Sequence, residues 1–278
     1  MSAEGFSEFE QKWLDARPEN RVVAVFLDAA LRRRAHALGV LVHELSLAAF
    51  RVREAQAAVA KLDWWRQELA AAAFGNPHHP ITQELFDEGV ASESDPALWP
   101  ALADGALAQL DQPGTGTLAA LIEQLEPFYG AIAVAESALL LGGSGSPEAN
   151  AALWTFSHLL HELAALGSGE RRLPLPLGLL ARHGLVRAEL TQPSAARNLL
   201  IKDFLDELVL EINGALGVAS ARSLGLRTRV RLDRQLIAGA LKSADPLPYL
   251  ARNARAGYWR ALWATWREGR AATRETMR

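Results

Sequence analysis

Residues 61–69 read KLDWWRQEL, residues 79–80 read HP and residues 172–185 read RLPLPLGLLARHGL, and these stretches decide the fold. The first consists mainly of strong helix formers around a tryptophan pair, which on a helix is typical of core packing. His78 and His79 lie in a proline-flanked turn, and this context favours helix capping over metal binding. We therefore expect a buried helix around the tryptophans and a second helix after the turn.

Helix-forming residues dominate the rest of the chain as well. Ala, Leu, Arg and Glu are abundant almost everywhere, whereas runs typical of β-strands are nearly absent. Residues 38–49 and 199–212 carry apolar side chains at helical spacing, which must be buried against other helices. Ser146 and Pro147 follow a glycine-rich loop as a predicted N-cap and first helical position. The sequence predicts an all-α bundle in which residues 1–278 form one domain.

The composition of the 278 residues excludes several classes of protein. Because there is no cysteine, a disulfide framework and a thiolate site are excluded, and a reducing compartment is expected. The polar residues 1–10 predict no secretory signal, and the most apolar stretch, 38–50, is interrupted by His43 and Glu44. We expect a cytoplasmic protein, either soluble or attached peripherally to the inner face of a membrane, without a nucleic-acid partner.

The C-terminal quarter is strongly basic, although the net charge of the chain is only −3. Residues 222–278 contain 13 Lys and Arg against 4 Asp and Glu. A helix at about 250–275 is expected to carry an aromatic stripe and arginines, namely Trp259, Trp263, Trp266, Arg260 and Arg267. Two alternatives are open. The stripe docks on the protein's own core, which we favour, or it forms a surface for an anionic membrane or a protein partner.

The three stretches quoted first, in this order and spacing, resemble the squalene/phytoene synthase family. Its members carry a Leu-x-Trp-Trp-Arg-x-Glu-Leu-like segment followed by His-Pro, and later a Leu-Pro ahead of a helix that ends near Leu-x-x-x-Gly. The corresponding residues here are 62–69, 79–80, 173–174 and 180–184, within a match of about residues 20–190. The resemblance implies a bundle of the isoprenoid synthase type around a central apolar cavity.

The resemblance also implies two DxxxD motifs, with which the family's enzymes hold magnesium against a diphosphate. Residues 40–62, where the first should lie, contain no aspartate and only Glu44 and Glu54. Residues 149–169, where the second should lie, contain a single acid, Glu162. Carboxylates four apart share one helical face and one cation, and neither stretch offers such a pair. We therefore expect no metal, no cofactor and no catalytic residue of the family's kind.

Other side chains are expected to line the central cavity in place of those motifs. The candidates are Glu54, Trp154, Ser157, His158, His161 and Glu162. Two histidines three apart beside an acid also suit a zinc site, but the order is neither HExxH nor its inversion. We favour mutual hydrogen bonds among these histidines and the glutamate over a metal site. The acidic residues within 203–211 are predicted to form a solvated helix face.

Two functions follow from the resemblance and from the missing motifs. The favoured one is a non-catalytic protein that binds an isoprenoid or other apolar ligand, or that assists assembly with a protein partner. That branch includes a phytoene-synthase-like assembly factor of mitochondrial complex I, which shares the spacing from Glu-Leu at 44–45 to Trp-Trp at 64–65. The alternative is a prenyltransferase-type enzyme that acts on isoprenoid diphosphates with atypical residues. Those residues would be Glu54, His158, His161 and Glu162.

Overall fold

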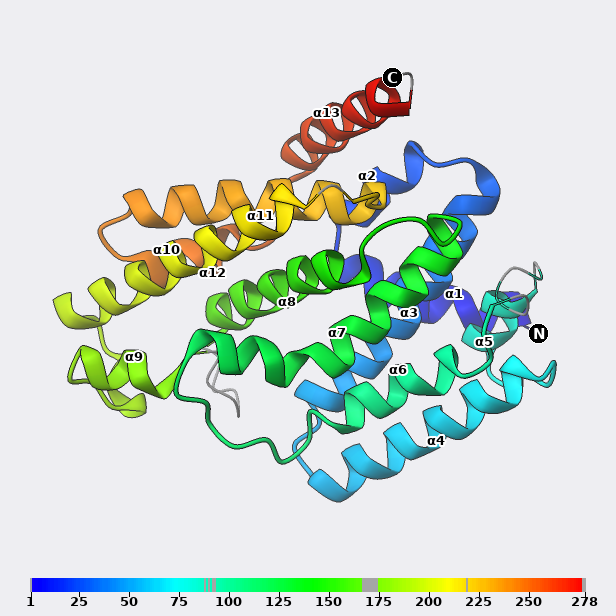
Figure 1. The fold of residues 1–278 in the computed structure, drawn as a ribbon, viewed down its shortest axis with the longest axis horizontal. Helices are drawn as coiled ribbons and strands as arrows, with labels where there is room; N and C mark the ends of the chain where they lie inside the picture. Colours follow the sequence, from blue (N-terminus) through cyan, green and yellow to red (C-terminus); the bar gives the residue numbers. More distant parts are fainter. Residues whose placement is uncertain are drawn as a thin grey trace.

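The computed structural model describes residues 2–87, 89, 91, 94–166, 175–218 and 220–276, with side chains described between residues 5 and 271. Throughout this part of the chain every regular element is a helix, and no strand is present (Figure 1). The predicted all-α fold is confirmed. Residues 172–174, which belong to the third stretch quoted from the sequence, lie outside the described residues.

Helices of very different lengths follow one another along the described chain. In order they are α1 (Ser2–Ala16), α2 (Glu19–Val25), α3 (Ala29–Phe50), α4 (Ala55–Ala73), α5 (Pro80–Phe86), α6 (Leu98–Leu107), α7 (Leu118–Leu140), α8 (Pro147–Ala164), α9 (Leu177–Arg182), the 3-10 helix η2 (Arg187–Thr191), α10 (Ala195–Gly217), α11 (Leu224–Lys242), α12 (Pro246–Asn253) and α13 (Tyr258–Thr276). The longest are α3, α7 and α10, with 22, 23 and 23 residues.

Two helix starts have the side-chain caps that the sequence predicts. Ser146 Oγ accepts a hydrogen bond from the Ala149 amide at 3.3 Å, and Pro147 takes the first position of α8. His79 Nδ1 accepts a hydrogen bond from the Ile81 amide at 3.2 Å and caps α5. The predicted capping roles of Ser146 and His79 are confirmed.

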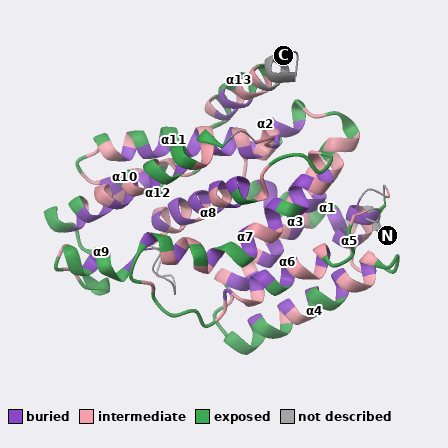
Figure 2. Ribbon diagram, in the orientation of Figure 1, coloured by how far each residue is buried: buried purple, intermediate pink, exposed green. Residues whose placement is uncertain are grey.

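Helices α7 and α8 form the centre of the bundle. Helices α3 and α6 pack against α7, while α10 and α11 pack against α8. Figure 2 shows the buried residues concentrated along these central helices. Among the described residues α7 is the one helix that is long and apolar enough to cross a membrane. The expectation that residues 38–50 come nearest to a membrane span is therefore wrong. Because other helices surround α7 and its Phe128 is fully buried, α7 is a core helix of the bundle.

Only one member of the tryptophan pair on α4 is buried. Trp65 is 2% exposed, whereas Trp64 is 46% exposed and packs edge-to-face against Trp65 and His79. Adjacent residues on a helix point about 100° apart, so both rings cannot face the same core. The expectation that the pair is a core feature is therefore correct for Trp65 and wrong for Trp64.

Helix α13 docks on the bundle through small side chains and leaves its aromatic stripe outside. Ala261 and Ala264 are buried, in a cluster that includes Val22 of α2 and Leu232 of α11. The tryptophans of α13 are exposed. The favoured expectation, in which the stripe docks on the core, is wrong, because the opposite face of the helix carries alanines that let the backbones of α2, α11 and α13 come close.

Helices α6 and α7 approach each other closely at Gly105. A Cβ atom at this position would lie 2.4 Å from the backbone carbonyl oxygen of Pro127 in α7. Backbone atoms cannot turn aside as the tip of a flexible side chain can. An alanine at position 105 must therefore push the two helices apart.

Gly105→Ala is expected to lower the free energy of unfolding by about 1–3 kcal/mol because of this overpacking. The matched control is Gly214→Ala, since Gly214 is exposed on α10 and a Cβ atom there would meet no atom within 4 Å. The control should raise the free energy of unfolding by up to about 1 kcal/mol through helix propensity. Denaturant unfolding of both variants measures the difference, and effects of the same sign would contradict the close approach of α6 and α7.

Candidate functional site

A cavity of about 590 Å³ lies between α1, α2 and α3 on one side and α7 and α8 on the other. Residues 222–225 and the connection between α12 and α13 also line it. Much of the wall is apolar and includes Val23, Leu27, Val42, Leu47, Phe50 and Ile132. The ionisable side chains of the wall come from several different helices.

Five of the six expected cavity residues line this cavity, and all five lie on α8. They are Trp154, Ser157, His158, His161 and Glu162. The sixth, Glu54, does not line it and is exposed at the N-cap position of α4. The expectation for Glu54 is wrong because α3 already ends at Phe50, and Arg51 lines the cavity at that end instead.

Two polar side chains of α8 have partners on other elements. Glu162 Oε1 accepts a hydrogen bond from Arg51 Nη2 at 2.7 Å, beyond the end of α3. His161 Nε2 lies 2.9 Å from Asp233 Oδ1 on α11, while the His158 ring packs against aromatic rings. Partners from α11 and from the end of α3 thus reach these side chains, because neighbouring positions of α8 face different helices. The mutual hydrogen bonds expected from the sequence stay a prediction. Across the described residues, no group of three or more His, Asp or Glu side chains is placed to hold a metal ion.

Burial determines the charge of the pair formed by His161 and Asp233. Burial, followed by the positive charge of Arg229, lowers the pKa of His161 to about 4, although Asp233 acts in the opposite direction. Burial alone would raise the pKa of Asp233, but attraction to His161 and Arg229 outweighs it and the net shift is downward. At neutral pH the pair is a neutral imidazole that donates a hydrogen bond to a carboxylate.

Glu136 on α7 is a buried acid in the cavity wall. Its Oε2 accepts a hydrogen bond from the Trp154 indole at 2.8 Å, and its Oε1 accepts one from the Ser223 hydroxyl. Burial raises the pKa of Glu136, although both hydrogen bonds oppose this effect. The carboxyl group is thus engaged by two neutral donors, and its surroundings disfavour negative charge.

The Arg17 guanidinium in the cavity makes no direct ion pair, although the carboxylates of Glu19 and Asp233 are near enough to act on its pKa. Arg229 Nη1 donates a hydrogen bond to Glu19 Oε1 at 2.5 Å, so those two charges are paired. The Arg17 side chain lines the same cavity and makes no hydrogen bond or ion pair with any residue that the structure describes. Burial, and then repulsion by Arg229, lower the pKa of Arg17 to about 10, so it stays charged at neutral pH. The cavity therefore combines apolar walls with an unpaired positive charge.

The cavity residues outside α8 were not identified from the sequence. Arg17 and Glu19 flank the helix break at Pro18, and Arg229 and Asp233 are four apart on α11. Ionisable residues four apart on an otherwise apolar helix face are a usable signal of a buried polar site. This signal identifies a face but not its partner, because Glu19 and Arg229 are 210 residues apart in sequence.

The acidic stretch of α10 does not line the cavity. Asp206 and Glu211 are exposed, which confirms the predicted solvated face for these two residues. Asp203 Oδ2 instead lies 2.9 Å from His183 Nε2, and Glu207 forms an ion pair with Arg182 at 3.3 Å, both in the segment that ends α9. Their charges therefore help to hold α9 against α10.

The lowered pKa of His161 predicts a loss of stability in acid. A histidine with a lower pKa in the folded than in the unfolded protein stabilises the fold above its unfolded value of about 6.5. This contribution is lost as the pH falls through the folded value of about 4. His161→Gln keeps a donor for Asp233 and cannot take up a proton. The free energy of unfolding of the variant should therefore fall less steeply between pH 7 and pH 4. The difference in slope corresponds to the uptake of up to about one proton on unfolding.

Denaturant unfolding at several pH values measures this slope. The native chain, measured under the same conditions, is the reference for the slope. A native slope in His161→Gln would contradict the assignment of the acid sensitivity to the buried pair.

Solved structures of other proteins show which known fold the chain resembles. No protein family profile and no curated protein sequence matches the chain. The solved structure of a dehydrosqualene synthase in complex with a ligand superposes with a TM-score of 0.73 at 15% sequence identity, covering 99% of this chain and 98% of that chain. Squalene synthase HpnC from Alicyclobacillus acidocaldarius superposes with a TM-score of 0.63 at 14% identity, covering 92% and 95%. At these identities the likeness concerns the fold, and the chain has the isoprenoid synthase fold of the squalene/phytoene synthases.

Proposed function

We propose that the protein binds an amphiphile with an isoprenoid or other lipid chain and an acidic end, and that it does so without catalysis. The observation that carries this proposal is the unpaired Arg17 guanidinium inside a largely apolar cavity. A charge shielded from water without a directly hydrogen-bonded counter-charge is costly, and an anionic group on a ligand relieves that cost. The volume of about 590 Å³ falls within the range of small-molecule sites.

The lining of the cavity suits the two ends of such a ligand. Arg229 lies near enough to Arg17 to lower its pKa, so an anionic end would meet two guanidinium groups, one of them already paired. A guanidinium binds carboxylates and phosphates through two parallel hydrogen bonds. Val42, Leu47 and Ile132 offer apolar surface to the chain, where each buried methylene contributes about 0.8 kcal/mol.

The acids of the cavity support binding without metal chemistry. Glu162 is paired with Arg51, and burial raises the pKa of Glu136. A magnesium ion takes oxygen ligands and needs ionised carboxylates that are not committed elsewhere. Recruiting Glu162 would release the Arg51 guanidinium beside the metal, where the two positive charges repel. Recognition by a guanidinium is therefore better supported than recognition through a metal.

Farnesyl diphosphate and farnesol are a matched pair of probes, because they share the chain and differ at the acidic end. We expect calorimetry in the presence of EDTA to detect binding of farnesyl diphosphate. Arg17→Gln should weaken this binding by about 10–100-fold, the equivalent of a hydrogen bond to a charged group. Farnesol has no anionic group for Arg17 to bind, so its affinity should change by less than about threefold.

Arg21→Gln is the matched control, because Arg21 lies on the neighbouring α2, pairs with Asp15 and does not line the cavity. It should leave both affinities unchanged. Val42→Trp fills apolar space and should weaken both probes, while thermal unfolding checks that each variant is folded. Binding only in the presence of magnesium, or formation of squalene or phytoene, would contradict the proposal and favour the prenyltransferase alternative.

A further inference from the structure

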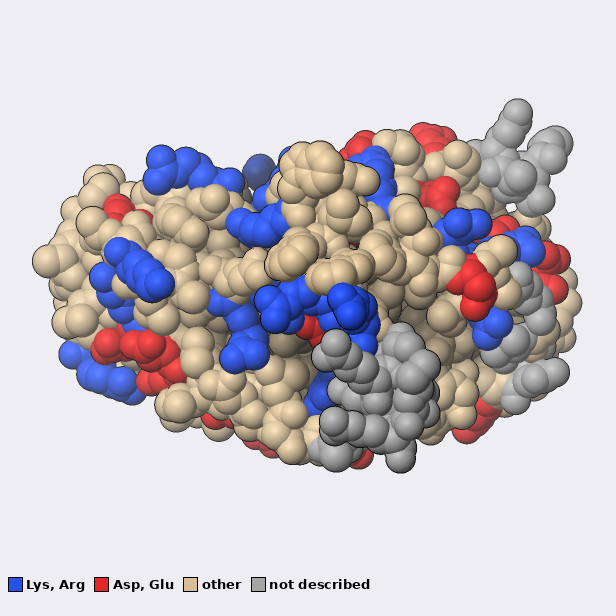
Figure 3. All heavy atoms as spheres, turned by 90° about the horizontal axis from the view of Figure 1, so that it is seen from above, with Lys and Arg blue, Asp and Glu red and all other residues tan. Residues whose placement is uncertain are grey.

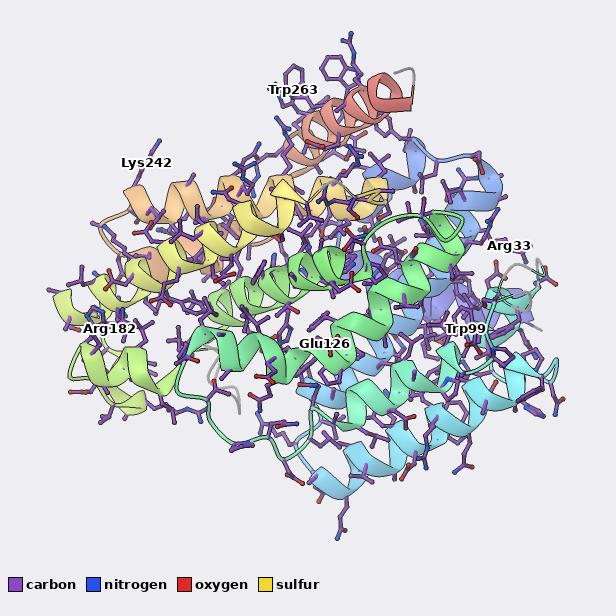
Figure 4. The ribbon with its side chains drawn as sticks, viewed as in Figure 1. Arg33, Trp99, Glu126, Arg182, Lys242 and Trp263 are labelled. Carbon is purple, nitrogen blue, oxygen red and sulfur yellow. The ribbon has the colours of Figure 1, made fainter. Side chains whose placement is uncertain are left out.

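The outward face of α13 carries tryptophans that neither the core nor the cavity uses. Trp259, Trp263 and Trp266, which we call the aromatic row, are 77%, 56% and 38% exposed. In Figure 4 the Trp263 side chain points away from the body of the molecule. Large apolar side chains left in water cost free energy, and a contiguous group of them marks an interaction surface.

The aromatic row lies opposite the face by which α13 is held. Successive residues of a helix are about 100° apart, which confines the row to an arc of about 60° and places Ala261 and Ala264 on the far side. Glu268 also faces the bundle, where its Oε1 accepts a hydrogen bond from Arg231 Nη1 of α11 at 2.5 Å. The core cannot cover the row unless α13 first detaches from α2 and α11.

Positive charge accompanies the aromatic row. Arg255, Arg267 and Arg270 are exposed, and the Arg270 guanidinium lies over the Trp266 ring at 4.9 Å from its centroid. Figure 3, which views the molecule from above, shows several Lys and Arg side chains grouped near the middle of the face that α13 tops. Because the acid Glu268 is turned inward, the outer surface beside the row is basic.

A second basic feature lies beside α13. A hollow of about 410 Å³ is bordered by α11 and by Glu268 of α13, and its basic residues are Arg222, Arg227, Arg231 and Arg234. Four arginines and one carboxylate thus line the hollow, and Arg231 binds that carboxylate. With the exposed Arg255, Arg267 and Arg270, the surface around the aromatic row is complementary to a negatively charged partner.

From the aromatic row and the arginines around it, we propose that α13 docks the protein on the surface of an anionic lipid bilayer. Tryptophan rings settle at the level of the lipid headgroups, where arginines reach the phosphates. The row lies on a helix at the edge of the bundle, a shape that meets a flat surface more readily than a groove (Figure 1). A second copy of the chain is a poorer occupant, because a two-fold interface would bring the same arginines face to face.

Docking also positions one end of the cavity. Ala254 and Arg255, which directly precede α13, line the cavity, so this end would face the bilayer. An apolar ligand would then pass between membrane and cavity with little exposure to water. This consequence rests on the proposed function, whereas the docking itself does not, since the aromatic row lies outside the cavity.

Flotation of the full chain with vesicles tests the docking. Vesicles of phosphatidylcholine with phosphatidylglycerol should carry the protein, vesicles of phosphatidylcholine alone should carry much less, and added salt should release it. The double variant Trp259→Ser/Trp263→Ser should lose at least about tenfold in vesicle affinity, because it removes two indole rings that the bilayer would bury. Both positions are exposed in the free protein, so its thermal unfolding should match that of the native chain.

Phe74→Ser is the matched control, because Phe74 is a strongly exposed aromatic residue at the end of α4 and should not affect flotation. Absence of flotation, or equal binding to neutral vesicles, would overturn the proposal. Light scattering that shows a dimer of the native chain and a monomer of the double variant would overturn it too, and would assign the row to a second copy. The double variant should bind farnesyl diphosphate as the native chain does, which separates failure of docking from failure of the cavity proposal.

Discussion

The pairing of charges inside the cavity is the constraint on which the rest of the bundle depends. Charged groups withdrawn from water cost several kcal/mol unless a partner compensates them. The pairs join helices that are distant in sequence: the buried Glu19 of α2 with Arg229 of α11, the neutral His161 of α8 with the Asp233 carboxylate of α11, and, nearer the surface, Glu162 of α8 with Arg51 after α3. The contacts that fix these helices around the cavity therefore also determine which charges a ligand meets there.

Local features of the fold could be predicted because they depend on residues close in sequence. Ser146 caps α8 through an amide three positions away, and the stretch at 61–69 consists mainly of strong helix formers and lies within α4. The burial of Trp65 and the exposure of Trp64 depend on where the other helices lie, and no local pattern contains that information. The same limit explains Glu54, whose position was decided by the end of α3 at Phe50.

The candidate site was less predictable than the fold for a definite physical reason. His161 and Asp233 are 72 residues apart, and Arg51 and Glu162 are 111 apart. Helical spacing shows that such residues share a face, but the partner across the cavity follows only from tertiary packing. In α13 the spacing correctly indicated an aromatic stripe, yet the buried face proved to be the alanine face. A stripe of large apolar residues therefore identifies an amphipathic helix without showing which side packs inward.

The electrostatics of the cavity are opposite in sign to those of a magnesium site. A magnesium site gathers ionised carboxylates, and the metal then neutralises the leaving diphosphate as a prenyl cation forms. In this cavity Glu19 is paired with an arginine and burial disfavours the charge of Glu136, while Arg17 remains a cation that makes no direct ion pair. A guanidinium holds an anion through hydrogen bonds but lacks the concentrated charge of a divalent ion. On our proposal, the helical scaffold therefore keeps a cavity for an acidic lipid and retains that lipid intact, because the group that recognises the anion does little to promote its departure.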